Sequence, residues 1–206
     1  LNVKKTIYAS SRMVCKIDYI PKTFDDYCPP NLYGESKMKG EKLIKTNARH
    51  PYIIVRPTSI WGPWFEIPYK TFFDTVKSGK FFMPKNINPK KSFGFVLNTT
   101  YQIDKLLFSQ ETLQQTYYLS DYPNIEVSTW ASLIAKHFEV SQPKRLPLSI
   151  LKSIALVGDL LKKFGYKNPP LTSFRLNNII TDMVYDLNDL KKVCGNLPYS
   201  LEEGVA

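Results

Sequence analysis

Two apolar segments that flank a helix-forming segment constrain the fold of this chain most strongly. Residues 51–57 (PYIIVRP) form a β-branched run without polar alternation, which is typical of a strand buried on both faces of a parallel sheet. Residues 4–10 (KKTIYAS) form a shorter apolar strand, and residues 32–47 between the two have a helix-forming composition. The order strand, helix, strand predicts one βαβ unit and therefore an α/β fold.

Helical and strand patterns continue along the rest of the chain. Helices are expected at 69–80, 99–108, 128–138 and 148–164, strands at 94–98 and 116–121, and loops at 16–31 and 58–68. We expect Ser128 to cap its helix, Glu41 to form an ion pair with Lys45 one turn on, and Ser200 with Glu203 to form the capping box of a last helix.

The helix expected at 148–164 has an apolar stripe and a basic tail. We expect the stripe to pack on the core, and contact with a membrane surface is the alternative. No apolar run approaches the roughly 18 residues that would suggest a membrane span. Residues 1–11 also lack the order of regions found in a signal peptide, so we expect a cytoplasmic protein without stable membrane insertion.

The cysteines, the histidines and the charge narrow the function classes. Cys15, Cys28 and Cys194 form no CxxC pair, and His50 and His137 have no ligand-spaced neighbours, so we expect reduced structural thiols and no metal site. The net charge of +10 suits a nucleic acid, an anionic membrane or a phosphorylated ligand. The lysines are scattered, however, which favours a solvated basic surface and no nucleic-acid partner.

Tyr33 and Lys37 stand four positions apart, so a helix would place them on one face. Tyr101 and Lys105 repeat this spacing, and only the context separates the two pairs. The first pair follows a strand that ends near Ser11, and the carboxyl ends of neighbouring parallel strands meet at one edge of a sheet. A hydroxyl, a phenol and an ammonium are therefore predicted to converge there, whereas the second pair is interpreted as packing plus surface.

The segments YASSRMV, YGESK and IIVRPTSIWGP resemble the second half of an extended short-chain dehydrogenase/reductase of the sugar-nucleotide epimerase/dehydratase branch. FGFVLNTTYQIDKLL, YYLSD and MVYDLNDLKKVCG fit its later segments. The resemblance implies the C-terminal portion of a Rossmann-like doubly wound parallel sheet plus a small mixed α/β substrate-binding domain. It places the sheet and the Ser/Tyr/Lys site in residues 1–57 and the substrate domain mainly in 58–206, with segments near 95–122 returning to the sheet.

The resemblance also implies roles at the predicted edge. Tyr33 matches the tyrosine that exchanges a proton with a sugar hydroxyl or ketone while hydride moves to or from nicotinamide. A free phenol titrates near about pH 10, and the positive charge of Lys37, which also holds the nicotinamide ribose in the family, favours phenolate. Ser11 matches the residue that hydrogen-bonds the reacting oxygen, with Ser10 as the alternative if the register slips by one.

Further contacts are implied around these three residues. The predicted cofactor contacts are Tyr33, Lys37, Pro57 and Thr58, and the predicted substrate contacts are Ser11, Ser59, Lys80, Lys91, Arg145 and Arg175. The four basic residues are candidates for the diphosphate of the substrate, although each is also compatible with a plain surface position. Trp61, Trp64 and Phe65 are candidates for the pocket lining or for core packing.

Departures from the family pattern narrow the chemistry. Arg12 and Met13 stand where 4,6-dehydratases have Asp and Glu, and related decarboxylases use a Glu at the second position, so neither reaction is expected. Thr99 and Thr100 replace a common acidic pair. What remains needs only Ser, Tyr, Lys and a nicotinamide: epimerisation through a transient ketone, or simple ketone reduction.

The dinucleotide fingerprint G-x-x-G-x-x-G is not present among the nine glycines. In the family this turn binds the pyrophosphate, so we expect an N-terminal half of roughly 100 residues or more to be absent. Three hypotheses follow: the C-terminal part of an NAD- or NADP-dependent nucleotide-sugar epimerase or reductase for surface-polysaccharide biosynthesis, a truncated or split-gene fragment without independent catalysis, and a basic nucleic-acid or membrane-surface protein. The partners expected from the first are a nucleotide sugar, the missing N-terminal half and, if complete, a second copy in a homodimer.

Overall fold

The computed structural model describes residues 3–110, 116–166, 169 and 171–206. The chain forms two compact units, each built from separate segments. The first unit comprises Leu1–Phe65, Ser92–Ile125 and Met183–Gly204, and the second comprises Glu66–Lys91, Glu126–Asp182 and Val205–Ala206.

A three-stranded parallel sheet forms the centre of the first unit. Its order is β1 (Thr6–Ala9), β2 (Tyr52–Pro57), β7 (Thr116–Leu119). Ala9 pairs with Val55, and Pro57 pairs with Leu119, so the three carboxyl ends lie along one edge. In β2 every residue but the last is buried, as its unalternated sequence predicts.

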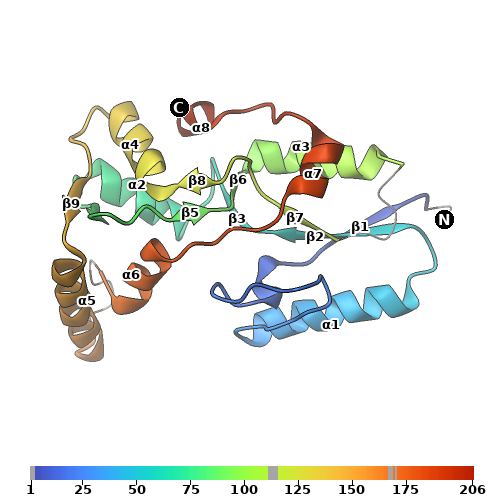
Figure 1. Cartoon of the computed structure of the whole chain (residues 1–206), viewed down its shortest axis with the longest axis horizontal. Coiled ribbons are helices and arrows are strands. Elements are labelled where there is room, and N and C mark those ends of the chain that lie inside the picture. Colours follow the sequence, from blue (N-terminus) through green and yellow to red (C-terminus); the bar gives the residue numbers. More distant parts are fainter. Residues whose placement is uncertain (1–2, 111–115, 167–168, 170) are drawn as a thin grey trace. The chain divides into compact units, whose positions relative to one another are not determined.

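Helices cover both faces of this sheet. Helix α1 (Leu32–Asn47) lies on one side, and α3 (Val96–Phe108) with α7 (Asn188–Cys194) lies on the other (Figure 1). The predicted α/β fold with a sheet covered on both faces is therefore confirmed. A hydrophobic cluster forms on the side of α3 and α7 and includes Ile53, Val55, Leu106, Leu119 and Leu190.

Short elements complete the first unit. A 3₁₀ turn η1 (Arg12–Val14) follows β1, β3 (Ser59–Trp61) pairs in parallel with β6 (Phe93–Phe95), and α8 (Leu201–Val205) begins at the predicted capping box. Gly34 of α1 lies so close to η1 that an added Cβ would be 2.1 Å from the Met13 carbonyl oxygen. Glycine at this position thus allows α1 to pack against η1.

The second unit consists of α2 (Tyr69–Lys77), α4 (Val127–His137), α5 (Leu148–Lys163), α6 (Ser173–Ile180) and the parallel pair β4 (Phe82–Pro84) and β9 (Lys144–Leu146). The two-residue strands β5 (Lys90–Lys91) and β8 (Ile125–Glu126) lie where the chain passes between units. Trp130 of α4 packs against Phe72 of α2 with ring centroids 4.7 Å apart. A separate cluster joins α5 to α6 through Leu151, Ala155 and Leu176.

Several local predictions were wrong. Residues 59–61 form a strand inside the expected loop, and α3 begins at Val96, so most of the strand expected at 94–98 is helical. Ser128 does not cap α4, because the helix already begins at Val127; its hydroxyl donates to the Asn88 side chain instead. The predicted domain bounds, 1–57 and 58–206 with a return near 95–122, stay predictions about which segments serve cofactor and substrate.

Candidate functional site

Three of the predicted residues converge where β1 ends. Ser11 follows β1 and caps η1, its Oγ accepting a hydrogen bond from the Met13 N–H at 3.1 Å. Tyr33 lies in the first turn of α1, whose N-cap Asn31 accepts from the Gly34 N–H at 2.9 Å. Because α1 packs against η1, the start of the helix is held beside the segment that carries Ser11.

Lys37 connects this helix to the strand. Its Nζ donates to the Ala9 carbonyl oxygen at 3.0 Å and lies 5.8 Å from the centroid of the Tyr33 ring. The Tyr33 side chain is 53% exposed, so the phenol is accessible to a ligand while its ammonium neighbour is fixed. The arrangement places a phenol beside a positive charge at the carboxyl edge of the sheet.

A buried polar network that the sequence reasoning missed lies next to these residues. The Ser10 hydroxyl donates to Oε1 of Glu41. Glu41 and Arg56 are 1% and 0% exposed and form a two-point ion pair, with Nε to Oε1 at 2.9 Å and Nη2 to Oε2 at 2.7 Å. The Tyr27 hydroxyl donates to Oε2 at 2.9 Å. Since buried charges are stable only when paired and hydrogen-bonded, the four side chains form one unit.

Arg56 has further partners on its remaining sides. Its guanidinium donates to the Phe24 carbonyl oxygen at 2.6 Å and to the Tyr118 hydroxyl at 3.2 Å, and it lies 5.3–5.5 Å from the rings of Phe24, Tyr27 and Tyr118. Burial lowers the pKa of Arg56, but the hydrogen bonds and charge of Glu41 outweigh this, so the pKa lies above its ordinary value. The guanidinium is therefore always charged.

The network joins the elements that carry the candidate site. Ser10 precedes Ser11, Glu41 lies on α1 with Tyr33 and Lys37, and Arg56 is on β2 just before Pro57. The expected Glu41–Lys45 ion pair is wrong, because Lys45 pairs with Asp25 at 2.6 Å. An arginine inside an apolar strand that is buried on both faces requires an acidic partner. This pattern in the sequence could have predicted the buried network.

Pro57 and Thr58 lie at the carboxyl end of the middle strand. Pro57 ends β2, and both the backbone N–H and the hydroxyl of Thr58 donate to the Leu119 carbonyl oxygen of β7, at 3.1 and 2.8 Å. Ser59 begins β3 and is half-buried. Their contacts to a cofactor or substrate stay predictions.

Asp121 is a second buried carboxyl that sequence reasoning missed. It lies two residues after β7 and is 8% exposed. It accepts hydrogen bonds from the Phe95 N–H at 2.9 Å and from Asn98 Nδ2 at 3.1 Å. Burial raises the pKa of Asp121 to about 6, although these two hydrogen bonds lower it. The carboxyl thus fastens the start of α3 to the end of the sheet with neutral donors alone.

The four predicted phosphate-binding residues all lie in the second unit and have different surroundings. Lys91 is 4% exposed, and its ammonium donates to the Thr181 carbonyl oxygen and, at 2.7 Å, to that of Asn178, which favours a structural role at the end of α6. Arg175 is exposed and donates to the Pro169 carbonyl oxygen at 2.8 Å. Lys80 is exposed in the turn after α2.

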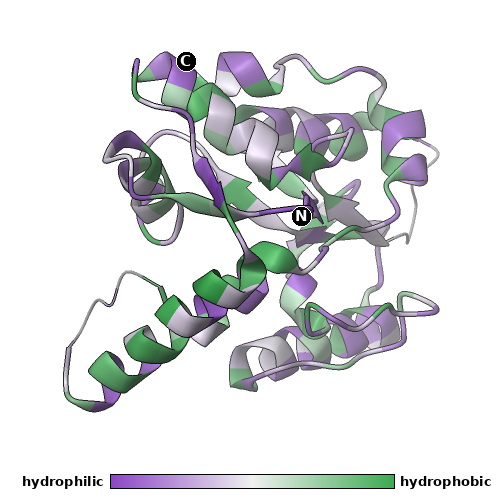
Figure 2. Ribbon diagram, turned by 60° about the vertical axis from the view of Figure 1, so that its left-hand side comes forward, coloured by the Kyte–Doolittle hydropathy of each residue, from purple (hydrophilic) through white to green (hydrophobic). Residues whose placement is uncertain are grey.

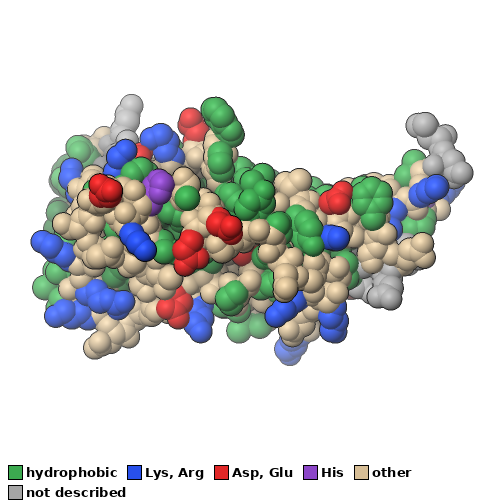
Figure 3. Space-filling model, turned by 90° about the horizontal axis from the view of Figure 1, so that it is seen from above, with side chains coloured by type: hydrophobic (Ala, Val, Ile, Leu, Met, Phe, Trp, Pro, Cys, Tyr) green, Lys and Arg blue, Asp and Glu red, His purple; other side chains and the backbone are tan. Residues whose placement is uncertain are grey.

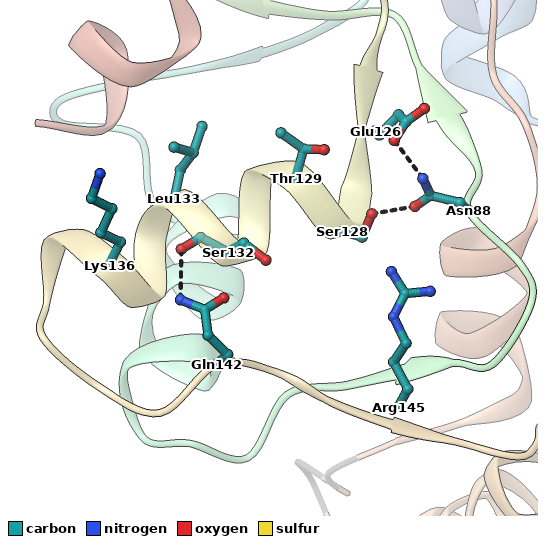
Figure 4. Close-up of a pocket in the computed structure, with 9 residues that line it drawn as sticks. All are labelled: Asn88, Glu126, Ser128, Thr129, Ser132, Leu133, Lys136, Gln142 and Arg145. Atoms are coloured by element: carbon teal, nitrogen blue, oxygen red, sulfur yellow. Dashed lines mark hydrogen bonds between the residues drawn. The ribbon is translucent and has the colours of Figure 1, made fainter.

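Arg145 lines an open pocket of about 520 Å³ (Figure 4). The other lining residues are Asn88, Glu126, Ser128, Thr129, Ser132, Leu133, Lys136 and Gln142. Figure 4 shows the Arg145 side chain reaching toward the linked Ser128–Asn88–Glu126 side chains, and Gln142 Nε2 donating to the Ser132 carbonyl oxygen at 3.3 Å. The pocket mixes one acidic with two basic side chains, so its charge alone selects no ligand.

The structure shows where the aromatic residues proposed for the pocket lie and how the charged side chains are distributed. Trp61 is 1% exposed and packs against Phe95 with centroids 5.0 Å apart, whereas Trp64 is 99% exposed; the first is a core residue and the second is available to a ligand. Figure 3 shows Lys and Arg dispersed among Asp and Glu on the face in view. Within the described ranges there is no cluster of three or more side chains that could hold a metal ion.

Together, the parallel sheet covered on both faces and the Ser/Tyr/Lys group at its carboxyl edge define a Rossmann-like α/β protein. Solved structures with this fold include a putative epimerase from Burkholderia cenocepacia J2315 (15% identity, 98% of this chain and 61% of that one, TM-score 0.68). Another is a UDP-glucuronic acid 4-epimerase from Bacillus cereus in complex with UDP-glucuronic acid and NAD (14% identity, 100% and 60%, TM-score 0.65). The expected resemblance to extended short-chain dehydrogenase/reductases is thereby confirmed at the level of the fold.

One curated protein is similar in sequence over the whole chain. It is the 3β-hydroxysteroid-dehydrogenase/decarboxylase isoform 1 of Arabidopsis thaliana, 25% identical over 235 residues that include 100% of this chain. No protein-family model matches the chain. The chain spans 52% of the curated relative and about three fifths of the two epimerase chains.

Proposed function

We propose that this chain carries the catalytic residues of an NAD(P)-dependent enzyme that epimerises, or reduces a ketone of, a nucleotide-diphosphate sugar. The observation that supports this most directly is the fixed Lys37 ammonium beside the exposed Tyr33 phenol, at the same strand end as Ser11. We further propose that the product serves surface-polysaccharide biosynthesis in the cytoplasm and that the complete enzyme is a homodimer.

The residues present suit the nicotinamide end of the cofactor. Tyr33, Lys37, Pro57 and Thr58 line the carboxyl edge of the sheet, where ligands of open α/β sheets bind. The glycine pattern for a pyrophosphate is not among the 206 residues, so no residue of this chain is assigned to that group. When bound, the nicotinamide supplies the hydride acceptor and donor.

The protein side chains then control one proton. Ser11 Oγ accepts from the Met13 N–H, so its own O–H is free to donate to the reacting oxygen of the substrate. Tyr33 accepts the proton of that hydroxyl as general base and returns it after the ketone stage. Lys37 stabilises the phenolate through its charge. In this scheme no carboxylate is needed, in agreement with Arg12 and Met13 beside Ser11.

The substitution Tyr33→Phe tests this proposal. We expect a 10²- to 10⁴-fold loss of turnover in epimerase and ketone-reductase assays with UDP-sugars, with binding of the dinucleotide mostly retained. Tyr101→Phe is the matched control because Tyr101 also has a lysine four positions on; its hydroxyl donates to the Cys194 carbonyl oxygen, so it should retain turnover. Retained turnover in Tyr33→Phe would refute the role of Tyr33. A purified wild-type protein that neither binds NAD nor melts cooperatively would favour the non-catalytic fragment.

A second candidate is oxidation of a secondary alcohol on a substrate without a nucleotide. The sequence similarity to a hydroxysteroid dehydrogenase/decarboxylase favours it, and the same three side chains would serve. Assays with NAD and either UDP-sugars or a 3β-hydroxysteroid distinguish the two: reduced cofactor accumulates only in the simple oxidation, whereas epimerisation regenerates the oxidised form.

A further inference from the structure

Helix α5 leaves an unusually large apolar surface uncovered. Its side chains exposed by 40% or more are Ile150 (46%), Leu156 (65%), Val157 (58%), Leu160 (54%), Leu161 (40%) and Phe164 (81%), the last being its C-cap. Figure 2 shows green, hydrophobic residues along most of this helix. Single exposed apolar residues are ordinary, but a contiguous set of this size marks an interaction surface.

Among the described residues, α5 packs through one narrow stripe. Leu151 and Ala155 are 1% and 0% exposed and contact the cluster around Leu176 of α6. An added Cβ on Gly158 would be 1.7 Å from the Leu171 carbonyl oxygen, so the backbones approach closely there. These positions, 151, 155 and 158, follow one line along the helix. We expected the apolar stripe of this helix to pack on the core. Positions 151, 155 and 158 do so, whereas the exposed apolar residues do not.

The exposed apolar residues share one side of the helix. At about 100° per residue they span an arc of roughly 140°, opposite the packed stripe. Lys152 and Lys163 both lie along one edge of this arc, next to Leu156. The only acidic residue of the helix is Asp159, and its carboxylate accepts hydrogen bonds from the Ser173 N–H at 3.2 and 3.3 Å, so it serves the start of α6. One edge of the apolar arc therefore carries positive charge.

We propose that α5 is a membrane-docking helix that lays this arc reversibly on a bilayer surface containing anionic phospholipids. A helix with a wide apolar side and a lysine border lies in the plane of the interface, with lysines among phosphate groups and apolar side chains below them. Among the described residues no helix is long and apolar enough to cross a membrane, so the contact is peripheral. An antiparallel two-fold contact with a second copy suits the surface less, because it would bring the two lysine edges together.

Co-sedimentation with vesicles tests the proposal. The purified protein should bind vesicles of phosphatidylcholine that contain about 30% of the anionic lipid phosphatidylglycerol. It should bind vesicles of phosphatidylcholine alone at least about tenfold more weakly. The variant Leu156→Gln/Leu160→Gln should lose about tenfold or more of the binding, because two apolar anchors are removed. Lys152→Gln/Lys163→Gln should lose about tenfold, and added salt should reproduce that loss.

The matched control is Leu43→Gln on α1, since Leu43 is 64% exposed on a helix of equal length; it should bind as the wild type does. No binding by a cooperatively folded wild-type protein would overturn the proposal. So would binding that the Leu156→Gln/Leu160→Gln variant retains, which would indicate attraction by net charge alone. Dimerisation in sedimentation velocity that this variant abolishes, without vesicle binding, would assign the surface to a second copy. None of these outcomes depends on Tyr33, so failure here leaves the proposed catalysis standing.

Discussion

Helices α1 and α5 have the same length, 16 residues. They differ in that α1 buries a charged side chain and α5 exposes apolar ones. The buried residues of α1 are Gly34 and the charged Glu41, whereas α5 leaves leucines and isoleucines exposed. Burial of a carboxylate is stable only because Arg56, Ser10 and Tyr27 together satisfy it. Among the described residues nothing covers the exposed apolar side of α5, and we propose that a membrane surface does. Both departures from simple amphipathic packing lie where we place function.

The largest effect is expected from breaking the network under α1. Glu41→Gln leaves the guanidinium of Arg56 buried without its counter-charge, which should lower the free energy of unfolding by about 3–5 kcal/mol. The double variant Glu41→Met/Arg56→Met removes the unpaired charge and should regain a large part of that loss. Denaturant unfolding measures both values.

The control for this comparison is Lys45→Gln, also on α1. Lys45 forms an exposed ion pair with Asp25, and such pairs contribute at most about 1 kcal/mol. If Glu41→Gln were as mild as Lys45→Gln, the network would not be the unit that stabilises α1. If the double variant were no more stable than Glu41→Gln, the cost would come from packing and not from the unpaired charge.

The buried carboxyl of Asp121, which has no arginine partner, can be compared with that of Glu41, which pairs with Arg56. Asp121 has neutral donors only, and burial raises its pKa to about 6, above about 4 for an unfolded Asp. Protonated Asp121 therefore favours the folded state. Its contribution is fully present below about pH 4 and is lost as the pH rises through about 6, a change of about 2–3 kcal/mol.

The difference between wild type and Asp121→Asn isolates this contribution from other titrating groups. Unfolding free energies measured between pH 4 and pH 7 should show the wild type losing about 2–3 kcal/mol relative to the variant. A difference that stays constant with pH would mean that burial does not raise the pKa of Asp121 in the folded protein above its value in the unfolded chain.

The sequence predicted the parts of the fold that depend on local pattern. The unalternated run of β2 and the helix over 32–47 follow from periodicity and composition, and the strand ends then place Ser11 and Tyr33 at one edge. The predicted ion-pair partner of Glu41 was wrong. Lys45 is nearer to Glu41 in the sequence, but Arg56, which pairs with Glu41, is on another element. Spacing along one helix contains no information about which charge becomes buried.

The exposure of apolar residues on α5 was not predicted, for a related reason. An apolar pattern shows which residues avoid water, but not which of them meet the core. Leu151 and Leu160 look alike in the sequence, yet one is 1% and the other 54% exposed. The two are nine positions apart and so lie on opposite faces of the helix, and the face with Leu151 is the one where Gly158 allows close approach of Leu171.

The smallest expected effect completes the comparison of the two helices. Leu160→Gln on α5 exchanges an exposed apolar side chain for a polar one of similar length, and surface substitutions of this kind change the free energy of unfolding by about 0.5 kcal/mol or less. Leu151→Gln, about two and a half turns earlier and on the packed line, should cost several-fold more because a buried amide is left without partners. Denaturant unfolding of the two variants decides the matter. A loss of about 2 kcal/mol or more in Leu160→Gln would mean that Leu160 is covered within the folded protein, which would remove the basis for assigning this side of α5 to a membrane.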